Sequence, residues 1–117
     1  MPLTPAEIAV AFSGQNYDEV EPYLADDIFW DLVAGKPRLD KGEVFVLLRE
    51  TTHDLKSMSS TLLEQRVIDG GDTVVVDSVI EYVYSDGVKS VVSSCDLYEF
   101  ESGIITHIRS YAGERSF

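Results

Sequence analysis

One carboxyl group stands out in this sequence because small and apolar side chains surround it. Asp96 lies in SSCDLYEF, residues 93–100, inside a long run that is predicted to be a β-strand. Such an aspartate either lies on a solvated face of a sheet or points into an apolar cavity. In a cavity the carboxyl group loses hydration, which disfavours its ionised form and raises its pKa. It could then move a proton near neutral pH, so Asp96 is the first candidate for chemistry.

Asp31 is the second candidate carboxyl group. It lies in a short alternating segment in which Trp30 and Leu32 share one face. On strict alternation Asp31 points away from Trp30 and into solvent. A β-bulge before Gly35 would turn it inward. The alternation favours a solvated Asp31.

The second half of the chain, which carries Asp96, is predicted to be an antiparallel meander. Alternating and β-branched runs cover residues 59–68, 73–84, 88–100 and 104–112. DGGD, SDG and ESG lie between these runs and are glycine-bearing turns typical of β-hairpins. Three tight turns joining four long strands make a meander.

Helix signals fill the first half. Thr4-Pro5-Ala6-Glu7 is a capping box with proline at the first helical position, and Gly14 ends that helix. Asn16 and Glu19 repeat the capping pattern for a second short helix that runs to Leu24. Asp40 and Glu43 begin a third, after Gly35-Lys36-Pro37 breaks the short strand.

Helices followed by strands predict an α+β fold in a single domain, residues 1–117. A sheet this apolar cannot leave both faces in water, so the three N-terminal helices must cover one face. A curved antiparallel sheet closed by helices on one side is cone-shaped and leaves a cavity, a natural site for a small molecule.

Composition limits the partners. The chain has 21 acidic and 9 basic residues, a net charge of −12 and a pI near 4.3, which disfavours nucleic acid and anionic membranes. The N-terminus lacks the basic region of a signal peptide, and no run is long enough to span a membrane. Cys95 is the single cysteine, so the expected location is cytoplasmic. No His, Cys or carboxylate pair has ligand spacing, so neither metal nor cofactor is expected.

Three segments together resemble the nuclear transport factor 2-like superfamily: ADDIFWDLVAG (25–35), LDKGEVF (39–45) and DLYEFESGIITHIRSYAGE (96–114). The resemblance covers the whole chain in order and implies a cystatin-like α+β cone. Its nearest branches are the SnoaL-like polyketide cyclases, the ketosteroid isomerases and the limonene epoxide hydrolases. The superfamily also contains binding proteins and transport factors, so the fold alone does not give the function.

Each catalytic residue of these branches corresponds to one position in this sequence. Asp96 matches the strand aspartic acid of the ketosteroid isomerases, which an apolar site keeps neutral so that it donates a hydrogen bond. Their general base falls at Leu32, with Asp31 one residue earlier, and their tyrosine falls at Ile8. Steroid-type isomerisation is therefore not expected.

The Arg-x-Asp pair and the last-strand aspartate of the epoxide hydrolases fall at Ser78, Ile80 and Ser110, which argues against that reaction. The SnoaL-like cyclases rely on an acidic cavity residue that moves a proton next to a carbonyl group, a role open to Asp96. The geometry of the superfamily implies a cavity lining beside Asp96 of Trp30, Leu32, Ser78, Ile80, Tyr82, Ser94, Tyr98, Ile108 and Ser110.

The resemblance also implies a homodimer through the outer sheet face. That face would carry Asp77, Val79, Glu81, Val83, Ser93, Cys95, Leu97, His107, Arg109 and Tyr111.

The sequence leaves two alternative functions open. In the first, the chain is a cofactor-independent isomerase or cyclase in which Asp96 donates or shuttles a proton on a hydrophobic carbonyl substrate, and Tyr82 and Tyr98 orient that substrate. In the second, it is a non-catalytic ligand-binding or assembly module that keeps the cavity without the chemistry.

Overall fold

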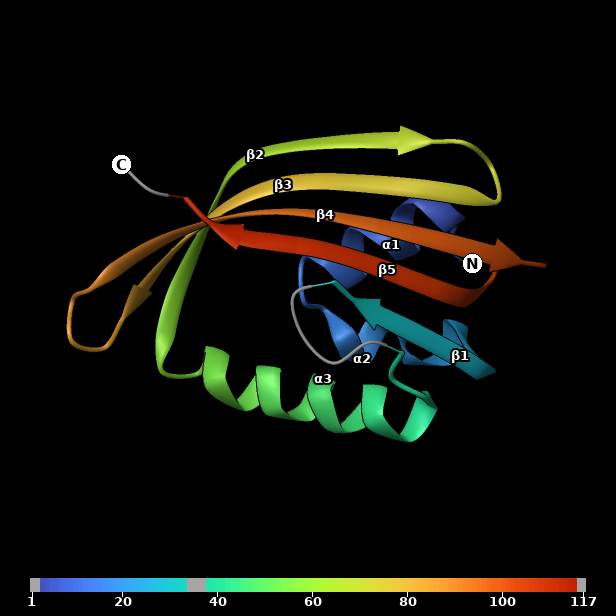
Figure 1. The fold of residues 1–117 in the computed structure, drawn as a ribbon, viewed down its shortest axis with the longest axis horizontal. Coiled ribbons are helices and arrows are strands. Elements are labelled where there is room, and N and C mark those ends of the chain that lie inside the picture. The colour runs from blue at the N-terminus through green and yellow to red at the C-terminus, as the bar shows by residue number, and fades with distance from the viewer. Residues whose placement is uncertain (1–2, 34–37, 116–117) are drawn as a thin grey trace.

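A single curved sheet carries the helices on one side (Figure 1). The computed structural model describes residues 3–33 and 38–115. The described elements are α1 (Pro5–Ser13), α2 (Tyr17–Val20), a 3-10 turn η1 (Glu21–Tyr23), β1 (Leu24–Leu32), α3 (Lys41–Leu55), β2 (Met58–Asp69), β3 (Thr73–Tyr84), β4 (Lys89–Glu101) and β5 (Ile104–Glu114). The predicted α+β fold is confirmed.

The predicted capping boxes begin the two longer helices. In α1 the Thr4 hydroxyl accepts from the Glu7 amide while the Glu7 carboxylate accepts from the Thr4 amide, and Asp40 and Glu43 do the same in α3. The second helix is shorter than predicted: Asn16 makes no side-chain cap bond, α2 ends at Val20, and Leu24 already begins β1. No helix among the described residues is long and apolar enough to span a membrane.

The sheet order is β1-β5-β4-β3-β2, and the four-strand meander forms as predicted. One feature differs from the prediction, because β1 pairs with β5 in parallel and the sheet is mixed rather than wholly antiparallel. A hairpin forces its two strands to run antiparallel, whereas β1 is separated from β5 by α3 and three strands. The predicted break at Gly35-Lys36-Pro37 lies outside the described residues.

The core lies between the helices and the inner face of the sheet. Phe12 of α1 is its centre, with edge-to-face ring contacts to Tyr17, Trp30 and Tyr98 at centroid distances of 5.2–5.6 Å. Tyr98 and its cross-strand neighbour Ile108 are fully buried. Aromatic packing at Phe12 therefore fixes the end of α1 against β1 and β4.

Polar contacts on the outer face join β1 to β5. The His107 ring lies 3.1 Å from Asp31 Oδ2 through Nε2 and 3.4 Å from Glu99 Oε2 through Nδ1, and Arg109 is 3.6 Å from Asp31. Phe29 stacks on His107. Asp31 points away from the Trp30 side, as alternation predicts, but it is ion-paired rather than freely solvated. Partial burial acts to raise the pKa of Asp31, yet His107 and the charges of Arg38 and Arg109 outweigh it and lower that pKa.

We expect Asp31→Asn to destabilise the fold at neutral pH and to have little effect in acid. A carboxylate with a lowered pKa stabilises the folded state above its ordinary pKa, and this stabilisation is lost as the pH falls through the lowered value. Urea midpoints of both proteins, measured at neutral pH and below about pH 3, test this. A difference in midpoint that stays constant across the range would contradict the assignment.

Phe12→Ala should reduce the free energy of unfolding by about 3–5 kcal/mol, because it leaves a cavity among three aromatic rings. Val88→Ala, at a side chain that is 56% exposed, is the control and should change it by less than about 0.5 kcal/mol. Equal losses in chemical denaturation would show that Phe12 is not the centre of the core.

Candidate functional site

Asp96 lines a pocket between the inner face of the sheet and the ends of α1 and α3. The pocket has a volume of about 240 Å³, and a cavity of about 150 Å³ is enough for one benzene ring. Its described lining is Phe12, Ser13, Gln15, Tyr17, Trp30, Leu32, Thr51, Ile80, Tyr82, Val92, Ser94, Asp96, Ser110 and Ala112. Apolar and aromatic side chains form much of this wall, and polar groups gather around one carboxyl group.

Two hydrogen-bond chains converge on that carboxyl group. The Ser13 hydroxyl donates to Asp96 Oδ2 at 2.9 Å, and its oxygen lies 2.6 Å from the Tyr98 hydroxyl. Ser13 has one hydroxyl proton and gives it to Asp96, so Tyr98 donates to Ser13. On the other side Trp30 Nε1 donates to Ser110 Oγ at 2.8 Å, and Ser110, the cross-strand neighbour of Asp96, hydrogen-bonds the carboxylate.

The environment raises the pKa of Asp96. Loss of hydration at the pocket wall is the largest cause, and the hydrogen bonds from Ser110 and from Ser13, with Tyr98 behind it, offset it only in part. The same burial raises the pKa of Tyr98 well above its ordinary value, with the charge of Asp96 adding to it. Asp96 is therefore the ionisable group of the pocket that can hold a proton above the usual carboxyl range.

Tyr82 faces the same space with its hydroxyl proton available. Gln15 Nε2 donates to the Tyr82 oxygen at 3.2 Å, so Tyr82 is the acceptor in that bond. The Tyr82 hydroxyl has no other hydrogen-bond partner within the described residues. Its O–H group can therefore donate to a ligand in the pocket.

Six of the nine side chains expected beside Asp96 line this pocket: Trp30, Leu32, Ile80, Tyr82, Ser94 and Ser110. The other three, Ser78, Tyr98 and Ile108, are buried behind the lining and have no surface in it. They lie on the predicted face of their strands, but they are buried. Tyr98 thus acts on Asp96 through Ser13 and does not reach a ligand.

Ser13 is the functional side chain that the sequence did not reveal. It is the last residue of α1, and it reaches Asp96 across a separation of 83 residues. Gln15, just beyond it, has a positive φ of 66°, a backbone conformation that few residues other than glycine adopt. This turn, within SGQN, points the polar end of α1 into the pocket.

The two positions aligned with the base and the tyrosine of the ketosteroid isomerases hold apolar residues. Leu32 lines the pocket but has no ionisable group, and Ile8 is fully buried in the core. Asp31, next to Leu32, is ion-paired on the opposite face. Among the described residues no group of three or more His, Cys, Asp or Glu side chains could hold a metal ion.

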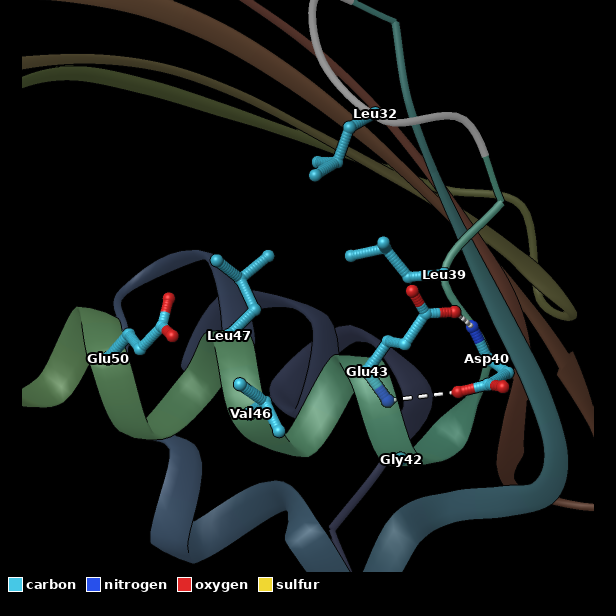
Figure 2. A pocket seen from close by; sticks show the side chains of 8 residues that line it. All are labelled: Leu32, Leu39, Asp40, Gly42, Glu43, Val46, Leu47 and Glu50. Atoms are coloured by element: carbon cyan, nitrogen blue, oxygen red, sulfur yellow. Dashed lines mark hydrogen bonds between the residues drawn. The ribbon is translucent and has the colours of Figure 1, made fainter.

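A larger groove of about 520 Å³ runs beside α3 and shares Leu32 with the pocket. Figure 2 shows Leu32 and Leu39 facing Leu47 across it. Of its carboxylates, Asp40 and Glu43 are engaged in the helix cap. The groove is larger, but two of its carboxylates cap a helix, so we place the candidate site at Asp96.

Comparison with known proteins identifies the fold. No protein-family model and no curated protein matches the sequence. The structure matches an NTF2-like protein of unknown function from Cytophaga hutchinsonii with a TM-score of 0.78 and 26% identity, over 91% of this chain and 93% of that one. The chain therefore has the nuclear transport factor 2-like fold that the sequence predicts.

Two further structures share the fold at lower identity. IdmH from Streptomyces antibioticus, named "a putative polyketide cyclase", matches with a TM-score of 0.73 and 17% identity, over 94% of this chain and 92% of that one. A protein of the same description from Pseudomonas putida matches at 0.71 and 16%, over 93% and 91%. At these identities they support the fold alone.

We expect Asp96→Asn to become more stable relative to the wild type as the pH rises. An aspartate whose pKa is raised by folding stabilises the folded state below its ordinary pKa, and this is lost as the pH rises through the raised value. Asparagine does not ionise, so the Asp96→Asn variant does not lose this stability as the pH rises. Urea midpoints from acid to neutral pH measure the difference. If the urea midpoint of Asp96→Asn minus that of the wild type stays constant or decreases as the pH rises, the raised pKa is contradicted.

Proposed function

We propose that the chain binds a small hydrophobic carbonyl compound in the Asp96 pocket and catalyses a proton transfer on it without a cofactor, as an isomerase or a cyclase would. The observation that carries this is the Asp96 carboxyl group, which has a raised pKa and lies at the meeting point of two hydrogen-bond chains in an apolar pocket. Such groups cluster at functional sites. Two proteins of the same fold are each described as "a putative polyketide cyclase".

Asp96 and Tyr82 divide the work in this reaction. The Asp96 carboxylate takes a proton from the carbon next to the substrate carbonyl group, and the Tyr82 hydroxyl donates to the carbonyl oxygen as negative charge develops there. Asp96 then returns the proton to another atom of the same intermediate. The proton is conserved, so no oxidant or second substrate is needed.

The hydrogen bonds around Asp96 suit a group that carries the proton in both directions. Ser13 and Ser110 stabilise the carboxylate when it is charged, and burial stabilises the neutral acid. Because Leu32 lies where a separate base would be, one carboxyl group must both remove and return the proton. Tyr98 and Trp30 act as positioning residues through the two serines.

The pocket favours a neutral, ring-sized substrate or substrate portion. Its volume of about 240 Å³ and its Phe12, Trp30 and Ile80 walls match a flat apolar group. A net charge of −12 and the carboxyl group itself oppose an anionic ligand.

A ligand-binding module without catalysis is the second candidate. The residues that favour it are Leu32 and Ile8, which leave Asp96 without the partners of the ketosteroid isomerases. In that case Asp96 and Tyr82 would orient a bound carbonyl compound by hydrogen bonds alone.

Exchange of protons next to the carbonyl group of small cyclic ketones and enones, followed in deuterated water by NMR, separates the two. We expect Asp96→Asn to lower the exchange rate by at least about 100-fold, the usual contribution of a general acid or base. Tyr82→Phe should lower it less. Asp77→Asn makes the same chemical change at an exposed position on the neighbouring strand, opposite Cys95, and should leave the rate unchanged.

Equal rates in the wild type and Asp96→Asn would reject the catalytic role. Saturable binding of these ketones by both proteins, with no exchange above the rate in buffer, would establish the binding module instead.

A further inference from the structure

Strand β2 leaves one edge of the sheet open. It pairs with β3 alone, and Figure 1 shows it at the rim of the sheet, with β3 on one side only. The strand is 12 residues long, and all but Met58 are exposed. An edge of this length presents unpaired backbone N–H and C=O groups that can hydrogen-bond to another strand.

The opposite edge of the sheet, at β1, is partly paired. Trp30 of β1 forms an isolated antiparallel bridge with Leu39, with both backbone hydrogen bonds made at 2.8–2.9 Å. The edge of β1 is thus partly covered by the chain that leads into α3. On β2 the usual protections are sparse: the strand has no lysine or proline, and its one irregularity is the bulge between Leu62 and Glu64.

β2 also carries an unusual share of exposed apolar surface. Nine large hydrophobic side chains are exposed among the described residues, and four of them lie on this strand: Leu62, Leu63, Val67 and Ile68. Their exposed fractions are 39–54%. Leu62 and Val67 lie opposite Ile80 and Val76 on the inner side of the sheet, whereas Ile68 lies opposite Val75 on the outer side. Apolar surface therefore borders the edge on both faces, and exposed apolar surface of this extent favours an interaction site.

The sequence of the strand is complementary to itself when read antiparallel about Gln65. In the order LEQRV, Glu64 falls opposite Arg66 of a second copy, and Leu63 falls opposite Val67. By two-fold symmetry each pair occurs twice. Glu64 and Arg66 lie opposite Val79 and Asp77 of β3, so both are on the outer face of the sheet. Neither has an ion-pair partner within the described residues.

We propose that a second copy of this chain binds along the edge of β2, so that the two β2 strands pair antiparallel about Gln65 and join the two sheets. Directly opposite residues in an antiparallel pair are close enough for ion pairs and apolar contacts, and opposite charges there are favourable. The match supplies two Glu64–Arg66 pairs. Leu63 lies at the bulge, where the regular alternation of β2 ends, so the pairing rests on these charges, with the exposed Leu63 and Val67 flanking them.

A groove beside this edge adds apolar surface to the interface. It has a volume of about 520 Å³ and lies between α1 and β2, with Val10, Ala11 and Leu62 among its lining residues. Because Leu62 belongs to both the groove and the strand, a copy bound at the edge would lie next to the open side of the groove.

The outer face expected to form a homodimer is less suited to this role. Of the residues expected there, Tyr111 alone belongs to the exposed large hydrophobic side chains of the described chain. Asp31, His107, Arg109 and Glu99 are already paired with one another on that face. On the edge of β2, Glu64 and Arg66 have no ion-pair partner within the described residues and the apolar groups are exposed. The occupant of this edge does not depend on the chemistry of Asp96.

Charge reversal tests the pairing directly by sedimentation equilibrium. Glu64→Arg and Arg66→Glu each place like charges opposite one another twice, so each alone should raise the dissociation constant of the dimer at least about tenfold. An equal mixture of the two variants should form a heterodimer, because the introduced arginine then faces the introduced glutamate. The double variant, Glu64→Arg with Arg66→Glu, should dimerise like the wild type.

Leu97→Asp, on the outer face, and Asp96→Asn, in the pocket, are the controls and should keep the wild-type dissociation constant. Unchanged urea midpoints would show that the charge variants still fold. A wild-type chain that stays monomeric, or a dimer that both reversals leave intact, would overturn the proposal. A dimer that only Leu97→Asp separates would place the interface on the outer face.

Discussion

A carboxyl group that loses part of its hydration needs hydrogen-bond donors, and here the donors come from separate elements. Ser13 lies at the end of α1, Tyr98 lies in β4 with Asp96, and Ser110 lies in β5 with Trp30 of β1 behind it. These contacts form only when α1 is packed on the sheet and β1 is paired with β5. The polar centre of the pocket therefore depends on the whole architecture, and Phe12 is the packing residue that brings its parts together.

The two aspartates considered from the sequence show how one residue type takes opposite roles in one fold. Asp31 and Asp96 lie on different faces of the sheet, one beside cations and the other beside neutral donors. Cations lower the pKa of the first, while burial raises the pKa of the second. A charged aspartate thus joins two strands on the outer face, and an aspartate that holds its proton more tightly than usual lies in the pocket.

Local patterns predicted the elements well because their causes are local. The capping boxes at Thr4 and Asp40 and the glycine turns of the hairpins are short-range features, and strand alternation placed Asp96 on the inner side. Parity could not tell a residue that lines the pocket from one behind it, such as Tyr98, because helix packing decides that difference. The parallel pairing of β1 and the contact of Ser13 with Asp96 depend on distant parts of the chain, which periodicity does not record.

Leu32 has a consequence beyond its place in the lining. It lines both the Asp96 pocket and the groove beside α3, so its side chain borders a small chamber and a larger one. A change in the volume of this one residue would therefore alter both spaces. A fold of this kind can change the length of the molecule that it admits through a single substitution, while the polar cluster that would act on it stays in place.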